Sequence, residues 1–254
     1  MKQIPNLFTL LNLVFGCIAI ICIMQTGLEI TSSSAGEPII EIPEKMQWAS
    51  LFLALAAIID FCDGFIARLL KVPSEMGKQL DSLADVVSFG VAPGLIVYQF
   101  LRLSLAQEPD GLDAPIAWLL PALIVPCAGA YRLARFNIDT QQTYGFKGVP
   151  IPAVGLLFAS FPLIYWKTTD AWVITMLLNK WFLYAVVLSV SYLMVSTLPM
   201  MALKFKNISF KKLLPFLMIT VVAIVGAILF GWLAVPLSFI AYVVLSLLLK
   251  QTES

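Results

Sequence analysis

Eight long apolar segments run through the sequence and leave few folds open to it. About 20 apolar residues in a helix cross the roughly 30 Å hydrocarbon core of a bilayer, where a helix satisfies its own backbone hydrogen bonds. Only 12% of the 254 residues are charged, whereas a soluble domain carries about a quarter. The sequence therefore predicts an all-α, polytopic integral membrane protein, a bundle of about eight transmembrane helices. The segments are approximately 4–24, 47–69, 78–100, 116–138, 150–166, 181–201, 213–231 and 233–249.

The charges between the segments predict how the bundle is oriented. The connection 25–46 and the one after the third segment are rich in acidic residues. The alternate connections are basic, with Arg68, Lys71 and Lys78 in one, Arg132, Arg135 and Lys147 in the next, and four lysines between 204 and 212 in the third. Basic residues gather in cytoplasmic loops. We therefore expect a multi-pass protein of the cell (inner) membrane with both termini in the cytoplasm.

Four aspartates interrupt the second and third segments near one end: Asp60, Asp63, Asp81 and Asp85. An ionised carboxylate near hydrocarbon costs about 3 kcal/mol on insertion scales, and several together repel one another unless cations neutralise them. With 3.6 residues per turn, Asp60 and Asp63 share one helix face, and Asp81 and Asp85 stack with Gly77 on the next helix. A short turn joins these antiparallel helices, so the two acidic faces can meet.

Carboxylates at this seam are suited to binding divalent cations. The chain contains no histidine, and hard oxygen ligands favour Mg²⁺, Mn²⁺ or Ca²⁺ over zinc. Two ions would match the charge and could clamp a phosphoryl group. The simpler alternative is that the four carboxylates lie at a helix–loop junction and pair with Arg68, Lys71 and Lys78. Both interpretations place the four aspartates at the cytoplasmic end of the second and third segments.

The same region resembles a known signature, that of the CDP-alcohol phosphotransferase family. The matching run is Asp60-x-x-Asp63-Gly64-x-x-Ala67-Arg68, eight residues, then Gly77-x-x-x-Asp81-x-x-x-Asp85. The resemblance implies that Asp60, Asp63 and Asp81 bind two divalent cations and that Asp85 completes the metal site and acts as the general base. It also implies that Gly64, Ala67, Arg68 and Gly77 form part of the surface that holds the CDP group.

The start of the first segment, "PNLFTLLN", places Asn6, Thr9 and Asn12 on one helical stripe. By the same resemblance this region, with Asn6 and Thr9, contributes to the nucleotide pocket. Helix capping and interhelical hydrogen bonding are the alternative roles of such polar residues.

Three further stretches resemble the serine-using branch of the family: "SFGVAP" at 88–93, "YRLARFN" at 131–137 and "FKGVPIPA" at 146–153, with weaker support from "LMVSTLP" at 193–199. The resemblance implies transfer of a phosphatidyl group from CDP-diacylglycerol to the hydroxyl of L-serine. A serine carboxylate calls for a fixed cation, ideally an arginine fork. The candidates are Arg132, Arg135, Asn137 and Lys147. Alternatively, the two arginines only anchor the helix at lipid phosphates.

Other functions stay open at this point. The acceptor could be glycerol phosphate, inositol phosphate or choline. A cation- or proton-coupled transporter is the alternative outside enzymes, but it predicts ionisable residues near mid-membrane and a repeat between the chain halves. We expect one transmembrane catalytic domain over 1–254, with the signature at 60–85, the acceptor region at 131–153 and the last two spans, 213–249, peripheral. Membrane lipids are expected partners, nucleic acid is not, and a homodimer is expected from the resemblance.

Overall fold

A computed structural model of the chain describes residues 4–25, 27–32, 38–69, 74–108, 111–139, 146–201 and 210–250. Most of these residues are helical, as the apolar segments predict. The α-helices are α1 (Ile4–Gln25), α2 (Gln47–Leu69), α3 (Glu75–Asp85), α4 (Ala92–Ala106), α5 (Ile124–Ile138), α6 (Ile151–Lys167), α7 (Ala171–Leu177), α8 (Lys180–Val195), α9 (Phe210–Phe230) and α10 (Ala234–Lys250).

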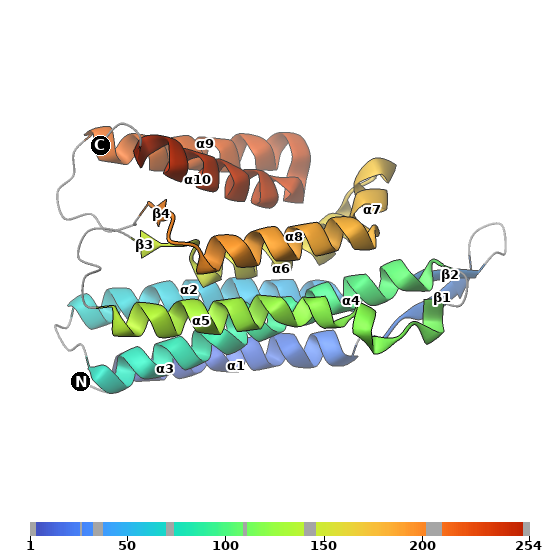
Figure 1. Cartoon of the computed structure of the whole chain (residues 1–254), viewed down its shortest axis with the longest axis horizontal. Helices are drawn as coiled ribbons and strands as arrows, with labels where there is room; N and C mark the ends of the chain where they lie inside the picture. The colour runs from blue at the N-terminus through green and yellow to red at the C-terminus, as the bar shows by residue number, and fades with distance from the viewer. Residues whose placement is uncertain are drawn as a thin grey trace.

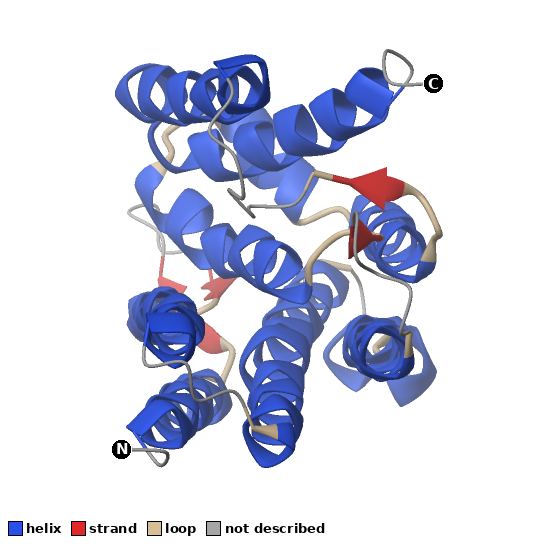
Figure 2. Ribbon diagram, turned by 90° about the vertical axis from the view of Figure 1, so that its left-hand side faces the viewer, coloured by secondary structure: helices blue, strands red, loops and turns tan. Residues whose placement is uncertain are grey.

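The long helices run roughly side by side along the longest axis of the molecule (Figure 1). One end of the bundle, on the left in that view, contains the first residues of α1 and the last residues of α2, α5 and α10. Seen from this end, the helices pack as a bundle with short strands at its margins (Figure 2). Strands β3 (Phe146–Lys147) and β4 (Pro199–Met200) form an antiparallel pair at this end. The antiparallel pair β1 (Glu29–Ser32) and β2 (Pro38–Glu41) lies at the opposite end.

Helices α3 and α4 are two parts of one helix, Glu75–Ala106. They are joined by a π-helical turn, η2 (Val86–Val91), which begins directly after Asp85. Such turns are uncommon and often lie at functional sites. The turn contains most of "SFGVAP", and its Phe89 is fully buried, while Gly90 and Gly94 pack against Pro126 of α5. This motif therefore fixes how the third predicted span packs against α5.

Four stretches within the described residues are long and apolar enough to span a membrane, by length and composition: Pro5–Gln25, Glu44–Ile66, Glu75–Ala106 and Leu217–Leu248. Helices α7 and α8, bent by 67°, make a fifth if they count as one span. The last stretch includes most of α9 and α10, which pack side by side after the turn η6 (Gly231–Leu233). The chain is therefore a multi-pass membrane protein with four or five such spans.

The predicted span 116–138 is a regular α-helix only in its second part. Residues 116–118 and 120–123 form 3-10 turns, η4 (Ile116–Trp118) and η5 (Leu120–Leu123), and α5 begins at Ile124. Prolines at 115, 121 and 126 explain this difference, because proline lacks the N–H for the helical hydrogen bond and clashes with the preceding turn. Helix α6 is also short, at 17 residues. The length and composition of the described helices therefore identify four or five of the eight predicted crossings and leave the others without such support.

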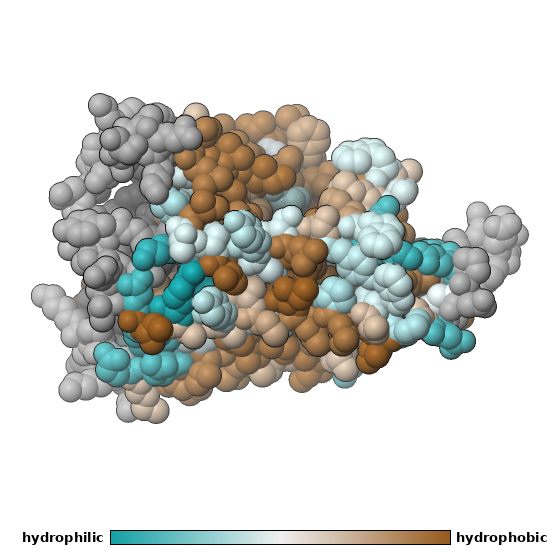
Figure 3. All heavy atoms as spheres, viewed as in Figure 1, coloured by the Kyte–Doolittle hydropathy of each residue, from teal (hydrophilic) through white to brown (hydrophobic). Residues whose placement is uncertain are grey.

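Apolar side chains lie both inside the bundle and on its surface. The core contains Phe89, Phe100 and Phe158, all fully buried. Large apolar side chains are also exposed, among them Ile228 on α9, which is 78% exposed. In Figure 3 hydrophobic residues dominate much of the middle of the visible face, and hydrophilic ones gather toward the two ends. This distribution is expected of a membrane protein in which the middle of the helical bundle contacts the lipid hydrocarbon.

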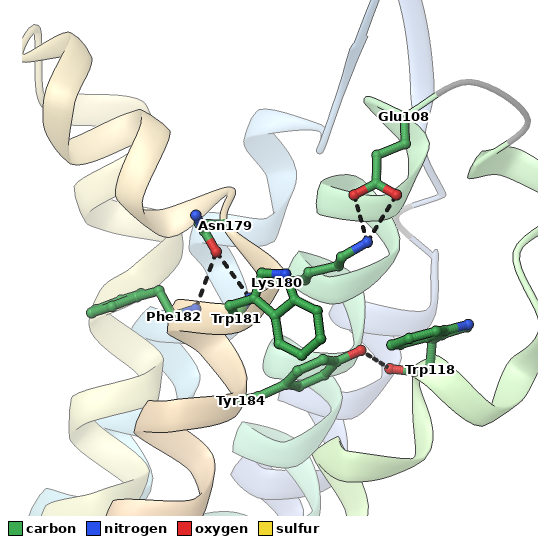
Figure 4. A network of polar contacts seen from close by, with 7 residues as sticks. All are labelled: Glu108, Trp118, Asn179, Lys180, Trp181, Phe182 and Tyr184. Carbon is green, nitrogen blue, oxygen red and sulfur yellow. Dashed lines mark hydrogen bonds and ion pairs between the residues drawn. The ribbon is translucent and has the colours of Figure 1, made fainter.

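A polar network ties α4 to α8 at the end opposite the start of α1 (Figure 4). Lys180 forms an ion pair with Glu108 at 2.6 Å, and the Tyr184 hydroxyl donates to the backbone oxygen of Trp118 at 2.7 Å. The Asn179 side chain accepts from two backbone N–H groups in the first turn of α8. Such a cap satisfies groups that would otherwise lack partners. The network therefore fixes the start of α8, whose other end lies near the aspartates' end of the bundle.

Candidate active site

Three of the four aspartates converge from two helices. Ligand oxygens of Asp60 and Asp63 on α2 and of Asp81 on α3 lie within 4.8 Å of one another. The chain reverses between these helices, so the 3.6-residue period places both acidic faces against the same seam. Asp63 is buried, and the other two are half-buried. The structure thus places these three carboxylates in one small volume.

Asp85 closes the cluster on its inner side. It is the last residue of α3 and only 6% exposed. Its carboxyl group lies within hydrogen-bonding reach of Asp60, and the Asn12 side-chain amide donates to its Oδ1 at 3.4 Å. Asp85 is therefore oriented from α1 as well as from α2.

Helix α1 forms the third wall of the cluster. Thr9 Oγ1 donates a short hydrogen bond of 2.7 Å to Asp63 Oδ2. Asn6 lies one turn earlier, beside Gly77 of α3, where an added Cβ would come within 3.0 Å of the Asn6 oxygen. The polar stripe of α1 therefore faces the aspartates, and Thr9 and Asn12 act on carboxylates directly. Their interhelical hydrogen bonds match the alternative role that the sequence left open for polar residues of this helix.

The donor set fits divalent cations. Among the described side chains, none of the four aspartates forms an ion pair with lysine or arginine; the ion pairs found there lie elsewhere, at Lys147–Asp139, Lys167–Glu44 and Lys180–Glu108. Clustered carboxylates without a cation would repel one another at high cost in a region of low dielectric. Carboxylate oxygens at mutual ligand distance are what Mg²⁺ and similar ions require. Of the three basic residues considered above as partners, only the Lys78 side chain is described, and it donates to the backbone oxygen of Asn137 and not to an aspartate.

The remaining signature positions lie on α2 beyond the aspartates. Gly64 follows Asp63 and is half-buried. Ala67 and Arg68 belong to the last turns of α2, but their side chains, like all of Lys71, fall outside what the structure describes.

The two predicted acceptor arginines on α5 have different surroundings. Arg135 donates to the backbone oxygens of Val195 and Ser196 at 2.7 and 2.9 Å, so it caps the end of α8. Arg132 is 5% exposed, and its Nε has no hydrogen-bond partner. No described group forms a hydrogen bond or ion pair with its guanidinium, which nevertheless lies within electrostatic range of Asp85. A buried guanidinium with five donors and no acceptor among the described residues is costly.

The other two candidates are engaged with neighbouring residues. The Asn137 amide donates to Ser82 Oγ at 2.8 Å, and Lys78 donates to the Asn137 backbone oxygen at 3.0 Å. Lys147 forms an ion pair with Asp139 at 3.2 Å and is 48% exposed. Asn137 therefore ties α5 to α3 beside the aspartates, and Lys147 lies at the surface of the same end.

The motifs at 146–153 and 193–199 are in contact with each other. Gly148 has φ of +76°, and an added Cβ would collide with the backbone oxygen of Met194. Its N–H donates to the Leu198 oxygen at 2.8 Å, and the Val149 N–H donates to the Leu193 oxygen at 3.1 Å. Glycine is needed where a left-handed backbone meets another backbone this closely. These motifs therefore build the end of α8 that Arg135 caps.

Sequence reasoning missed one residue near Arg132. Tyr242 of α10 lies within electrostatic range of the Arg132 guanidinium. It is distant in sequence from every motif noted above, and a tyrosine in an apolar segment carries no spacing signal. Only the packing of α10 could reveal it.

Comparison with known proteins gives a consistent result. Residues 2–188 match the family model described as CDP-alcohol phosphatidyltransferase. The chain is 31% identical to a CDP-diacylglycerol–serine O-phosphatidyltransferase of Bacillus subtilis, over 65% of this chain and 78% of the relative. It is 29% identical to the protein of that name from Mycobacterium bovis, over 87% and 75%, and 42% identical to the one from Helicobacter pylori J99, over 43% of each. The resemblance carried by the aspartate signature is thereby confirmed: the chain belongs to the CDP-alcohol phosphatidyltransferase family.

Proposed function

We propose that the protein transfers the phosphatidyl group of CDP-diacylglycerol to the hydroxyl of L-serine, giving phosphatidylserine and CMP. One observation carries this proposal: four carboxylates from α2 and α3 cluster together, and one of them, Asp85, lies within electrostatic range of Arg132, a buried guanidinium without a partner among the described residues. The names of the matched relatives specify the same reaction.

The carboxylates are the proposed cation ligands. Asp60, Asp63 and Asp81 would hold divalent ions, and Asp85 would complete a two-ion site. Mg²⁺ or Mn²⁺ fits such a site, with Ca²⁺ as an alternative. When bound, the ions neutralise the charge of the pyrophosphate and of the departing CMP. The chain itself keeps the carboxylates in place through Thr9, which donates to Asp63.

Asp85 is the proposed general base. The serine oxygen forms a bond to the phosphorus that carries the diacylglycerol, the bond from that phosphorus to the bridging oxygen breaks, and CMP leaves. The hydroxyl proton passes to a carboxylate oxygen of Asp85, which must lie within hydrogen-bonding reach of it. Asn12, which donates to Oδ1 at 3.4 Å, and Asp60, which lies within hydrogen-bonding reach, help to orient this carboxyl group.

Arg132 is the proposed ligand of the serine carboxylate. Its guanidinium can bind a carboxylate with two parallel hydrogen bonds. A phosphorylated acceptor would call for several free cations, yet Arg135 is bound to the end of α8 and Lys147 to Asp139. One free guanidinium among the described cations of this region suits a single carboxylate better. We assign Arg135, Asn137 and Lys147 to the support of this region.

The CDP group is proposed to lie along α1 to α3. Gly64, Ala67 and Arg68 would form its surface on α2, with Gly77 and Asn6 opposite. Gly77 supports this placement because its missing side chain lets Asn6 of α1 approach α3 closely. Thr9 would act indirectly, through Asp63.

The membrane arrangement follows from the charge pattern. We propose eight crossings of the cell membrane, with the active site and both termini in the cytoplasm, because the basic connections lie on that side. The whole chain would form one catalytic domain. A homodimer remains a proposal drawn from the family.

The reaction is tested by release of CMP. Purified full-length protein in lipid–detergent micelles receives CDP-diacylglycerol, Mg²⁺ and one acceptor at a time: L-serine, glycerol 3-phosphate, inositol phosphate or choline. We expect CMP only with serine, and none once the metal is chelated. Equal turnover with another acceptor, or full activity under strong chelation, would contradict the proposal.

The role of Asp85 is tested separately. The change Asp85→Asn removes the basic oxygen but keeps the shape, so turnover should fall by at least about a hundredfold while CDP-diacylglycerol still binds. Asp170→Asn, at the start of α7 and far from the cluster along the bundle, is the matched control and should retain full activity. Near-normal turnover of the Asp85 variant would remove Asp85 as the base.

A further inference from the structure

Helix α10 is tied to the acceptor end of the molecule although it lies outside the residues matched by the family model. The Tyr242 hydroxyl donates to the backbone oxygen of Met201 at 3.3 Å. One turn later, Ser246 Oγ accepts from the Met201 N–H at 3.3 Å, and Ser246 is 3% exposed. Two consecutive turns of α10 therefore form hydrogen bonds with Met201, the residue that follows β4.

Helix α5 holds the same segment of chain from its other side. Arg135 binds the backbone oxygens of Val195 and Ser196, and β4 pairs with β3 between these residues and Met201. Residues 195–201 therefore form a strap with α5 at one end and α10 at the other.

Arg132 lies one turn before Arg135 on α5. Its guanidinium is within electrostatic range of both Tyr242 and Asp85, but no described group forms a hydrogen bond with it. The long hydrogen bond from Tyr242 to Met201 is also weak, at 3.3 Å. An anion bound to Arg132 would offer the Tyr242 hydroxyl a charged acceptor, which forms a stronger bond than a backbone oxygen does.

We propose that Tyr242 is a second binding residue for the carboxylate of the acceptor amino acid, and this inference rests on the proposed function. Arg132 takes two lone pairs of the carboxylate, and the Tyr242 hydroxyl turns from Met201 to donate to a third. A carboxylate has about four such sites, so both residues can bind at once. Helix α10, expected from the sequence to be peripheral, would then complete the acceptor pocket.

The test is the change Tyr242→Phe in the full-length protein. Removing the hydroxyl should raise KM for serine about 10- to 100-fold, the range for a hydrogen bond to a charged group. It should leave kcat and KM for CDP-diacylglycerol within about twofold, because the ring still packs in α10. A purely structural role would instead shift both substrates' constants and kcat together.

Two control variants separate binding from support of the strap. Ser246→Ala removes the other bond to Met201 and a hydrogen-bonding contact of Tyr242 but keeps the Tyr242 hydroxyl itself, so KM for serine should rise far less than in Tyr242→Phe. Tyr192→Phe, on α8 and 71% exposed, should be neutral throughout. An unchanged KM for serine in Tyr242→Phe, or an equal rise in Ser246→Ala, overturns the inference alone. A wild-type protein that releases no CMP with serine overturns the proposed function and the inference with it.

Discussion

The hydrogen bond from Thr9 to Asp63 allows a sharp test of what α1 does. Thr9 Oγ1 is 2.7 Å from Asp63 Oδ2 and 3.2 Å from the backbone oxygen of Pro5. A hydroxyl has one proton, so the shorter contact takes most of it. Both side chains are buried, with 4% and 6% exposed. The change Thr9→Val keeps the shape and leaves one oxygen of Asp63 without its donor.

The expected loss follows from the charge of the acceptor. A hydrogen bond to a charged group contributes about 1.5–3 kcal/mol, equivalent to about 10- to 100-fold in a binding constant. Residues that orient metal ligands show losses of the same size in metal affinity. The Mg²⁺ concentration for half-maximal turnover should therefore rise about 10- to 100-fold in Thr9→Val. Saturating Mg²⁺ should restore most of the maximal rate.

The assay is CMP release against Mg²⁺ concentration, with both substrates saturating. Thr175→Val is the matched control, because Thr175 also donates to the backbone oxygen four residues earlier, at 2.9 Å, but lies exposed on α7. It should leave the Mg²⁺ dependence unchanged. If Thr9→Val instead raises KM for CDP-diacylglycerol at an unchanged Mg²⁺ requirement, Thr9 contacts the nucleotide and the argument is refuted.

Three further predictions concern stability, each measured by thermal unfolding in detergent. Arg135→Gln should cost about 1–3 kcal/mol, because it leaves two partly buried carbonyl groups at the end of α8 without their donor; an undiminished stability would contradict the capping role. Gly148→Ala should cost at least about 1–3 kcal/mol from its positive φ, whereas Gly27→Ala, which meets nothing within 4 Å, should be nearly neutral; equal effects would argue against strain at 148. Glu108→Gln should cost at most about 1 kcal/mol, since this carboxylate is 48% exposed in its pair with Lys180, and CMP release should stay at the wild-type rate; a large loss of activity would show coupling between the two ends.

Local patterns in the sequence predicted much of the fold. Helix α2 has the expected bounds of 47–69, and α6 differs from the expected 150–166 by one residue, because charged residues and prolines delimit these apolar runs. The pair β1–β2 in the connection 25–46 was not foreseen, and neither was α7 between Lys167 and Lys180. Short elements of this kind depend on packing against the bundle more than on their own periodicity.

In the site, too, features that depend on spacing along one helix could be predicted, and features that depend on contacts between distant segments could not. The convergence of the aspartates could be anticipated, since spacing along a helix decides which side chains share a face. Arg132 and Arg135 could not be told apart, because residues three apart lie on the same side of a helix. What separates them is the position of the end of α8, which comes from a different part of the chain. The same reason hid Tyr242.

The π-helical turn at Val86–Val91 lies between the aspartates of α3 and the surface of α4 that packs in the bundle, and so affects how these two parts of one long helix are oriented relative to each other. Its hydrogen bonds span five residues instead of four, so it accommodates one residue more than an ordinary turn. Each residue of an α-helix advances the chain by about 100°. The wide turn absorbs this extra residue, so the aspartate face of α3 keeps its alignment with the face of α4 that packs on α5. A residue added or removed in the ordinary helical turns on either side would instead rotate Asp81 and Asp85 by about 100° relative to α4. The π-helical turn is therefore the place where this helix holds an additional residue without moving its carboxylates away from α2.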